Sequence, residues 1–263
     1  MLRFCQLNNM ILLHRITPFF IGLITAVVFF FITQQGLAPV QSSIVLVVCV
    51  SILLSRLLEW KVNTFQFWNF FGTPILFLIS CIGMVFLLEQ YFLIITIAVF
   101  STFLLTLFVE YVFQYTHLPS SYQPYSLEYM TMLLNVLTIF FLASSGFGIH
   151  LLIQTSLVVL AIIFFFLSFF LVHGALWVSK VSESTIKPFA LSGAILLTEF
   201  FVILNYLPTG FYTNAAFVTL FFYLFVGLTR AHVLHKLSRS VIKRYLITAT
   251  VLLFVIIVSS KWV

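Results

Sequence analysis

The sequence predicts an all-α membrane protein, a bundle of about nine transmembrane helices with the N-terminus in the cytoplasm and the C-terminus outside. Three observations predict this fold class. Hydrophobic residues make up 63% of the 263 positions and charged residues 7%, whereas about 25% of a typical soluble domain is charged. Apolar runs long enough to cross a bilayer recur from Ile16 to Ser260. Lys and Arg are concentrated beside alternate loops between these runs.

The distribution of Lys and Arg sets the predicted orientation. Eleven of the twelve lie on one side of the span pattern: Arg3, Arg15, Arg56, Lys61, Lys180, Lys187, Arg230, Lys236, Arg239, Lys243 and Arg244. Lys261 alone lies on the other side. Because Lys and Arg resist translocation, the basic side is cytoplasmic. The net charge of +6 therefore indicates contact with membrane lipids, and we expect no nucleic-acid partner.

Each predicted span is a stretch of roughly 20 apolar residues, the length that a helix needs to cross the hydrocarbon core. The spans are residues 16–32, 40–57, 68–88, 91–109, 129–147, 151–171, 188–207, 215–234 and 245–260. They must be helices, because an unpaired backbone amide in lipid costs several kcal/mol. Barrel strands would alternate polar and apolar residues, which the run Ala161–Leu167 does not. Residues 1–263 are expected to form a single polytopic domain.

Turn-forming residues justify most of the span ends. Gly36 and Pro39 separate the first two spans, and Pro188 is expected to open the seventh. The weakest joints are Glu89-Gln90 and the segment Ser144–His150. A re-entrant hairpin at either joint would change the number of spans by two and leave the N-terminus inside.

Glu199 is the sharpest candidate for a functional residue, because an ionisable group within a span is costly. It lies about eleven residues into the seventh predicted span, which places it near the bilayer midplane. Two interpretations stay open. Glu199 is a proton, cation or headgroup site, or it is a structural carboxyl bonded to Tyr223 or Arg230 of the next span.

Two polar stripes define a second candidate site, a cleft open to the cytoplasm. One stripe comprises Thr102, Thr106, Glu110 and Gln114 at steps of four, and the other comprises Glu128, Thr131, Asn135, Thr138 and Ser145. Both converge on the tyrosine-rich loop that contains His117. The candidate cleft residues are Glu110, His117, Glu128 and Asn135. Packing and hydrogen bonding between helices is the plainer role for such stripes, and we prefer it.

Several familiar chemistries find no matching pattern. There is no H-E-x-x-H zinc motif, Walker loop, dinucleotide fingerprint or haem pair, and no Lys lies within a span as a retinal site requires. Ala143–Gly146 resembles the G-x-S-G segment of intramembrane serine proteases, but the first Gly is missing. The three cysteines form no C-x-x-C motif. We therefore expect no cofactor and no metal.

The C-terminal third carries a resemblance to a known family. It rests on Asn205–Gly210, Gly227–His232, Leu237–Tyr245 and the final Ser260–Trp262, and the segment from Phe108 to Leu134 is similar to the middle region of the same family. These segments resemble a family of polytopic membrane proteins of unknown function from candidate-phylum bacteria with small genomes. The resemblance implies a bacterial cytoplasmic (inner) membrane, and it assigns no functional residue.

Three functions compete at this point. The first is transport or handling of a lipid-linked or hydrophobic substrate, with Glu199 and the polar stripes along its path. The second is a membrane scaffold or assembly subunit, in which the same residues only join helices. The third is a membrane-embedded transferase or hydrolase that uses Glu110, His117 and Glu128 at the cytoplasmic interface. We favour a non-enzymatic role, and no particular protein partner is indicated.

Overall fold

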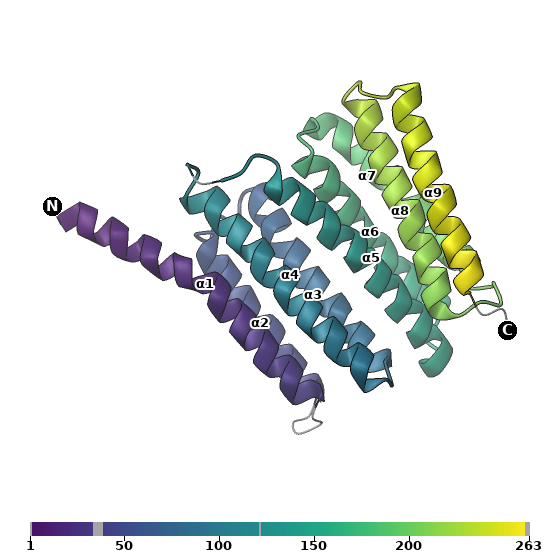
Figure 1. Ribbon diagram of the computed structural model, residues 1–263, viewed down its shortest axis with the longest axis horizontal. Helices are drawn as coiled ribbons and strands as arrows, with labels where there is room; N and C mark the ends of the chain where they lie inside the picture. The colour runs from purple at the N-terminus through teal and green to yellow at the C-terminus, as the bar shows by residue number, and fades with distance from the viewer. Residues whose placement is uncertain (1, 34–38, 121, 261–263) are drawn as a thin grey trace. The chain divides into compact units, whose positions relative to one another are not determined.

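The computed structural model describes residues 2–33, 39–120 and 122–260, with side chains from His14 onward. Within these residues it contains nine helices, each long and apolar enough to cross a membrane. They are α1 Leu2–Thr33, α2 Pro39–Leu57, α3 Phe65–Leu87, α4 Tyr91–His117, α5 Ser126–Ile153, α6 Leu157–Val178, α7 Glu183–Leu204, α8 Phe211–Val233 and α9 Arg239–Ser259 (Figure 1). This confirms the all-α class and, within the described residues, nine helices that could each cross a membrane. The orientation of the termini stays a prediction.

The joint between α5 and α6 lies further along the chain than its sequence suggests. Helix α5 runs without interruption through Ser144–His150 to Ile153, so the break expected in that segment is wrong. Gly146 serves close packing instead of a turn: a Cβ at this position would lie 3.0 Å from Cζ of Phe201. The turn comes at Gln154, whose φ is 57°.

Helix α7 also differs from its prediction, which began at Pro188. The helix begins at Glu183, after the N-cap Ser182, and Pro188 lies inside it. The last helical residue is Leu204, five residues after Glu199. At 1.5 Å per residue, Glu199 is about 8 Å from the middle of the helix, towards its C-terminal end. Its position relative to the bilayer midplane stays a prediction.

Three helices end in the same way without a glycine. Glu59 after α2, Lys180 after α6 and His235 after α8 adopt φ values of 54°, 61° and 53°. After α2 the amide of Trp60 donates to the carbonyl of Ser55 at 3.0 Å, and equivalent bonds follow α6 and α8. This is the Schellman arrangement, whose left-handed residue is usually Gly. A side chain there costs about 1 kcal/mol.

The first of two compact units is Met1–Leu134. Within it, α1 packs against α2 and α4, and α3 packs against α2 and α4. Figure 1 shows α1 extending beyond α2 and α4 at its N-terminal end. Helices α1 and α4 lie close together at Gly22, where a Cβ would be 2.5 Å from Oγ1 of Thr106. A side chain larger than hydrogen has no room between these two helices.

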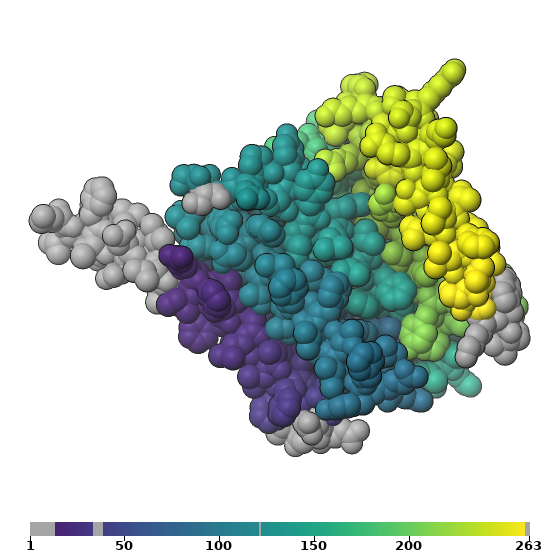
Figure 2. Space-filling model, viewed as in Figure 1, coloured from purple at the N-terminus to yellow at the C-terminus, as the bar shows by residue number. Residues whose placement is uncertain are grey.

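The second unit is Asn135–Val263. Here α7 packs against α6 and α8, and α8 packs against α9. The ring of Phe201 stacks on Phe147 and Phe164, with centroids 4.4 and 4.6 Å apart. In α9 only Ala249 is buried, and Figure 2 shows α9 in yellow, uncovered on the face in view. Much of the apolar surface of this unit is therefore available to lipid.

Candidate functional site

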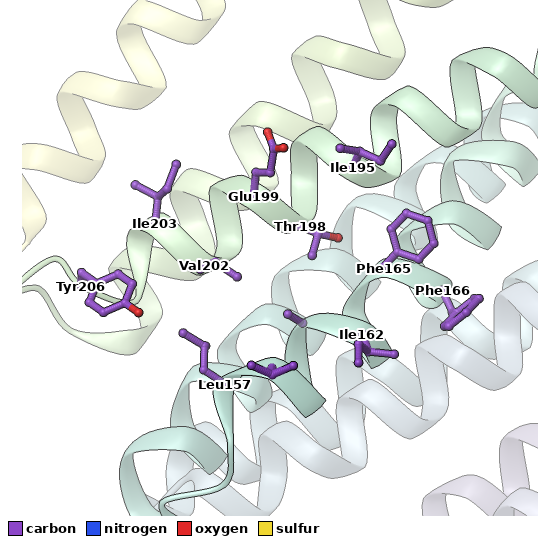
Figure 3. Close-up of a pocket in the computed structure, with 12 residues that line it drawn as sticks. Leu157, Ile162, Phe165, Phe166, Ile195, Thr198, Glu199, Val202, Ile203 and Tyr206 are labelled. Carbon is purple, nitrogen blue, oxygen red and sulfur yellow. The ribbon is translucent and has the colours of Figure 1, made fainter.

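An apolar groove runs along α6 and α7 in the second unit and encloses about 850 Å³ (Figure 3). It is lined by Leu157, Val158, Ala161, Ile162, Phe165, Phe166, Ile195, Thr198, Glu199, Val202, Ile203 and Tyr206. The opposite faces of both helices are buried through Phe164 and Phe201, which stack on each other. The volume lies within the roughly 300–1,000 Å³ of small-molecule sites. Groove and core thus occupy different faces of the same two helices.

Glu199 provides the ionisable group of this groove. Its side chain is exposed, and Figure 3 shows the carboxyl pointing away from the labelled side chains of α6. The neighbouring Thr198 hydroxyl donates to the carbonyl of Ala194 at 2.7 Å. In the part of the chain that the structure describes, no hydrogen bond or ion pair joins Glu199 to another residue. Glu199 therefore lacks the structural partner that one interpretation of the sequence required.

The two residues proposed as partners of Glu199 lie on α8. The ring of Tyr223 contacts Tyr245 of α9, with centroids 5.6 Å apart, and both rings line a small pocket with Arg244. Tyr223 thus has a neighbour that the sequence did not suggest. Arg230 is in the last turn of α8, at its basic end.

The polar stripe of α4 is satisfied largely within its own helix. The hydroxyl of Thr106 donates to the carbonyl of Thr102 at 2.8 Å, and Gln114 Nε2 donates to Glu110 Oε1 at 3.0 Å. Thr106 also lies against Gly22 of α1. This part of the stripe therefore faces a helix, as expected of residues that join helices.

The stripe of α5 is the more buried of the two. Thr131, Asn135, Thr138 and Ser145 are all buried, while Glu128 is half-buried. Asn135 Nδ2 is 3.5 Å from the carbonyl of Leu171 in α6, and its Oδ1 has no partner among the described residues. A common cleft of Glu110, His117, Glu128 and Asn135 stays a prediction.

His117 lines a second pocket, of about 300 Å³, at the end of the first unit where α2, α3 and α4 meet. Its polar lining comprises Glu59, Lys61, Thr64, Gln66, Tyr115, Thr116 and His117. Lys61 Nζ is 2.8 Å from Glu59 Oε2, and His117 Nε2 is 3.7 Å from Glu59 Oε1. The structure thus places His117 beside Glu59 and Lys61, two residues that carry no signal of a site in the sequence.

Several contacts fix the ring of His117. It stacks on Phe113 with centroids 5.4 Å apart and lies 4.6 Å from the ring of His14. Its Nδ1 is 2.7 Å from Oγ1 of Thr116. The side chain is 10% exposed, and Nε2 has no hydrogen-bond partner among the described residues.

Charge in this pocket is set by the pair of Glu59 and Lys61. The hydrogen bond from the Lys61 ammonium lowers the pKa of the Glu59 carboxyl, and it outweighs the opposing effect of partial burial. Both side chains are more than half exposed, so solvent screens their attraction. Among the described residues, no group of three His, Cys or Glu side chains has a geometry that could hold a metal ion.

Fold and sites together define a multi-pass α-helical membrane protein with an apolar groove and a polar pocket near a helix end. The chain belongs to the family DUF5656, described as proteins of unknown function, because residues 59–259 match that family. The matched region includes Glu59, His117 and Glu199. No curated protein and no solved structure matches the chain.

Proposed function

We propose that this protein binds a lipid-linked or other hydrophobic substrate and transports it or presents it for transfer. The chain of the substrate lies in the groove of α6 and α7, and its polar group meets Glu199. One observation carries the proposal: an exposed carboxyl stands at the edge of an otherwise apolar groove within a membrane span.

The free-energy cost of placing the Glu199 carboxyl in a bilayer supports a polar ligand. A charged side chain at the centre of a helix in the bilayer costs about 2.5–3.5 kcal/mol on insertion scales. Glu199 is nearer the helix end, where the cost is smaller, yet no other described residue hydrogen-bonds its carboxyl. A hydroxyl or amine of a bound molecule would supply the missing donor. Tyr206, 77% exposed at the end of the groove, has the amphipathic character of an interfacial residue.

Apolar contact alone cannot select a substrate in this groove. Lipid tails are as apolar as Ile162 and Phe166, so exchanging one hydrocarbon for another gains little free energy. Selectivity must come from the shape of the groove and from the polar contact at Glu199. Substitution of Glu199 is therefore the sharpest test of the proposal.

Orientation and location form part of the same proposal. We place the protein in a bacterial cytoplasmic membrane, with its N-terminus inside. The support is the set of basic residues beside the ends of α2, α6 and α8, for example Arg56, Lys180 and Arg230. With this orientation, the C-terminal end of α7 and Glu199 lie in the outer half of the membrane.

Photo-crosslinking of the full chain tests the proposal. The probe is phosphatidylethanolamine with a diazirine in one acyl chain, which offers both a hydrophobic chain and an amine. Ala161→Phe narrows the groove, whereas Ile163→Phe adds a similar group to the same helix outside the groove lining. We expect labelled peptides from α6 and α7, at least fivefold less labelling in Ala161→Phe, and no change in Ile163→Phe.

Glu199→Gln separates binding at the groove from general contact with lipid. The amide keeps the size of the side chain but cannot carry a negative charge, so we expect weaker labelling by the amine-bearing probe. Labelling by a phosphatidylcholine probe, which has no amine hydrogens, should change less. Equal labelling of wild type, Ala161→Phe and Glu199→Gln would contradict the proposal. Such a result would favour the scaffold role.

A further inference from the structure

We propose that the pocket formed by Glu59, Lys61, Gln66 and His117 binds a phosphate group. This site lies in the first unit, and it does not depend on the groove of α6 and α7 or on the proposed function. The phosphate belongs either to a soluble phosphomonoester or to a lipid headgroup, and the chemistry of recognition is the same for both.

The pocket lies at the N-terminal end of a long helix. α3 begins at Phe65 after the N-cap Thr64, whose Oγ1 accepts a hydrogen bond from the amide of Phe67 at 3.3 Å. Thr64 and Gln66 both line the pocket. The N-terminal end of a helix carries a partial positive charge, which favours an anion, although the N-cap Thr64 already bonds the Phe67 amide here.

A buried nitrogen supplies independent support. The His117 side chain is nine-tenths buried in the wall of the pocket, and its Nε2 has no hydrogen-bond partner among the described residues. The Thr116 hydroxyl donates to the carbonyl of Val112 at 2.8 Å, so His117 Nδ1 donates to Thr116, and Nε2 donates to a phosphate oxygen when the ring is protonated. Phe113 and His14 hold the ring in place. The ring is therefore fixed, and its buried Nε2 lacks a hydrogen-bond partner that a ligand could provide.

Lys61 completes the site with a positive charge. Its ammonium has three donors, and the contact with Glu59 at 2.8 Å uses one of them. Two donors remain for phosphate oxygens. The Glu59 carboxylate lies close to both groups: its Oε2 is 2.8 Å from Lys61 Nζ, and its Oε1 is 3.7 Å from His117 Nε2. Its negative charge should weaken anion binding.

The backbone before the pocket is held in an uncommon conformation. Glu59 and Trp60 both have positive φ, 54° and 52°. The turn is fixed by the amide of Val62, which donates to the carbonyl of Trp60 at 2.8 Å, and by Trp68 Nε1, which donates to the carbonyl of Val62 at 2.9 Å. These bonds fix the backbone on both sides of Lys61.

Binding by the purified full chain in a neutral detergent tests the proposal. The probes are inorganic phosphate, glycerol 3-phosphate, and phosphatidic acid in mixed micelles, with phosphatidylcholine as the reference lipid. Each is titrated while the melting temperature and the Kd are measured. Response to the soluble anions identifies a soluble phosphomonoester, and response to phosphatidic acid alone identifies a lipid headgroup.

The variants at Lys61 and Glu59 should change the Kd for phosphate in opposite directions. Lys61→Gln should raise the Kd at least tenfold, whereas Glu59→Gln should lower it several-fold. Lys187→Gln removes an exposed cation from α7 and should leave the Kd unchanged. His117→Leu should weaken binding, and His117→Gln, which keeps a donor, should restore much of it. If His117→Leu does not fold, the Lys61 and Glu59 variants still decide.

Three results would overturn the proposal. The first is no response to any phosphate probe beyond that to phosphatidylcholine. The second is an unchanged Kd in Lys61→Gln. The third is loss of binding in Glu59→Gln with binding retained in Lys61→Gln, which would identify the pocket as a cation site.

Discussion

Gly22 of α1 and Thr106 of α4 lie in direct contact, so close that a Cβ at residue 22 would be 2.5 Å from the Thr106 hydroxyl oxygen. The hydroxyl is held by its bond to the Thr102 carbonyl at 2.8 Å. Small residues that allow helix backbones to approach are common at membrane helix interfaces. Here a glycine on one helix faces one residue of the polar stripe on the other.

Gly22→Ala should therefore destabilise the first unit. The added methyl must displace Thr106 or separate the two helices, at a cost of about 1–3 kcal/mol. Thermal unfolding of the purified protein in detergent measures the loss. Thr106→Ala removes the obstructing oxygen, since the Thr106 Cβ itself is 3.5 Å from the position that the new methyl would take. The double variant should recover most of the stability of Thr106→Ala, and an additive loss would contradict this account.

Lys180→Gly should stabilise the protein. Lys180 has φ of 61° at the end of α6, and Gly adopts this conformation without the steric cost of a Cβ. We expect a gain of about 0.5–1 kcal/mol in the free energy of unfolding. Lys187→Gly is the matched control: Lys187 lies within α7, where Gly costs about 1 kcal/mol. Both variants lose one Lys, so a shared loss of stability would show that charge decides instead.

Glu59 should titrate below the ordinary range of a carboxyl, because the hydrogen bond from Lys61 lowers its pKa. A group with a lowered folded pKa contributes stability above its unfolded pKa. That contribution is lost as the pH falls through the folded value. Lys61→Met should therefore raise the pKa of Glu59. Nuclear magnetic resonance with ¹³C-labelled Glu measures both titrations. An equal pKa in both proteins would show that the ion pair has no effect in solution.

Topology is tested by fusions to the chain. An N-terminus inside and nine spans place Val263 outside, so alkaline phosphatase fused after it should be active and green fluorescent protein dark. Fusions after His235, in the basic loop between α8 and α9, should behave in the opposite way. A fluorescent fusion after Val263 would require an even number of spans. The loop between α4 and α5 would then be the first candidate for a different placement, because it carries no Lys or Arg.

Hydropathy predicts the spans well because the length of an apolar run is a local property. The ends are less predictable. The left-handed residues that follow α2, α6 and α8 are Glu59, Lys180 and His235, residue types that carry no turn signal. Gly146 looks like a break, yet it only makes room for Phe201, a neighbour 55 residues along the chain. Helix ends depend on contacts that composition does not reveal.

The candidate sites also divide into one that a local sequence pattern predicts and one that depends on tertiary contacts. Glu199 could be selected from sequence because one carboxyl in an apolar run is conspicuous. The pocket at His117 could not, because it needs Glu59 and Lys61 from another loop, and His14 from α1. In the sequence, Arg56 and Lys61 indicate only topology, since cations beside a span usually have that role. A cluster of several helices becomes visible only once the chain is folded.

The left-handed ends of α2, α6 and α8 also fix how each of these helices is seated in a bilayer. Each turns the chain sharply within two residues, so the following polar side chains leave the helix at a defined height. Lys61, Lys180 and Lys236 follow or occupy these turns. If the basic ends face the cytoplasm, each Lys ammonium group contacts anionic lipid headgroups at a fixed position along its own helix. Glycine at these turns would relieve backbone strain, but it would also make the turn more flexible and the height of the Lys side chain less defined. A variant that is more stable could therefore insert its helix at a different depth in the bilayer.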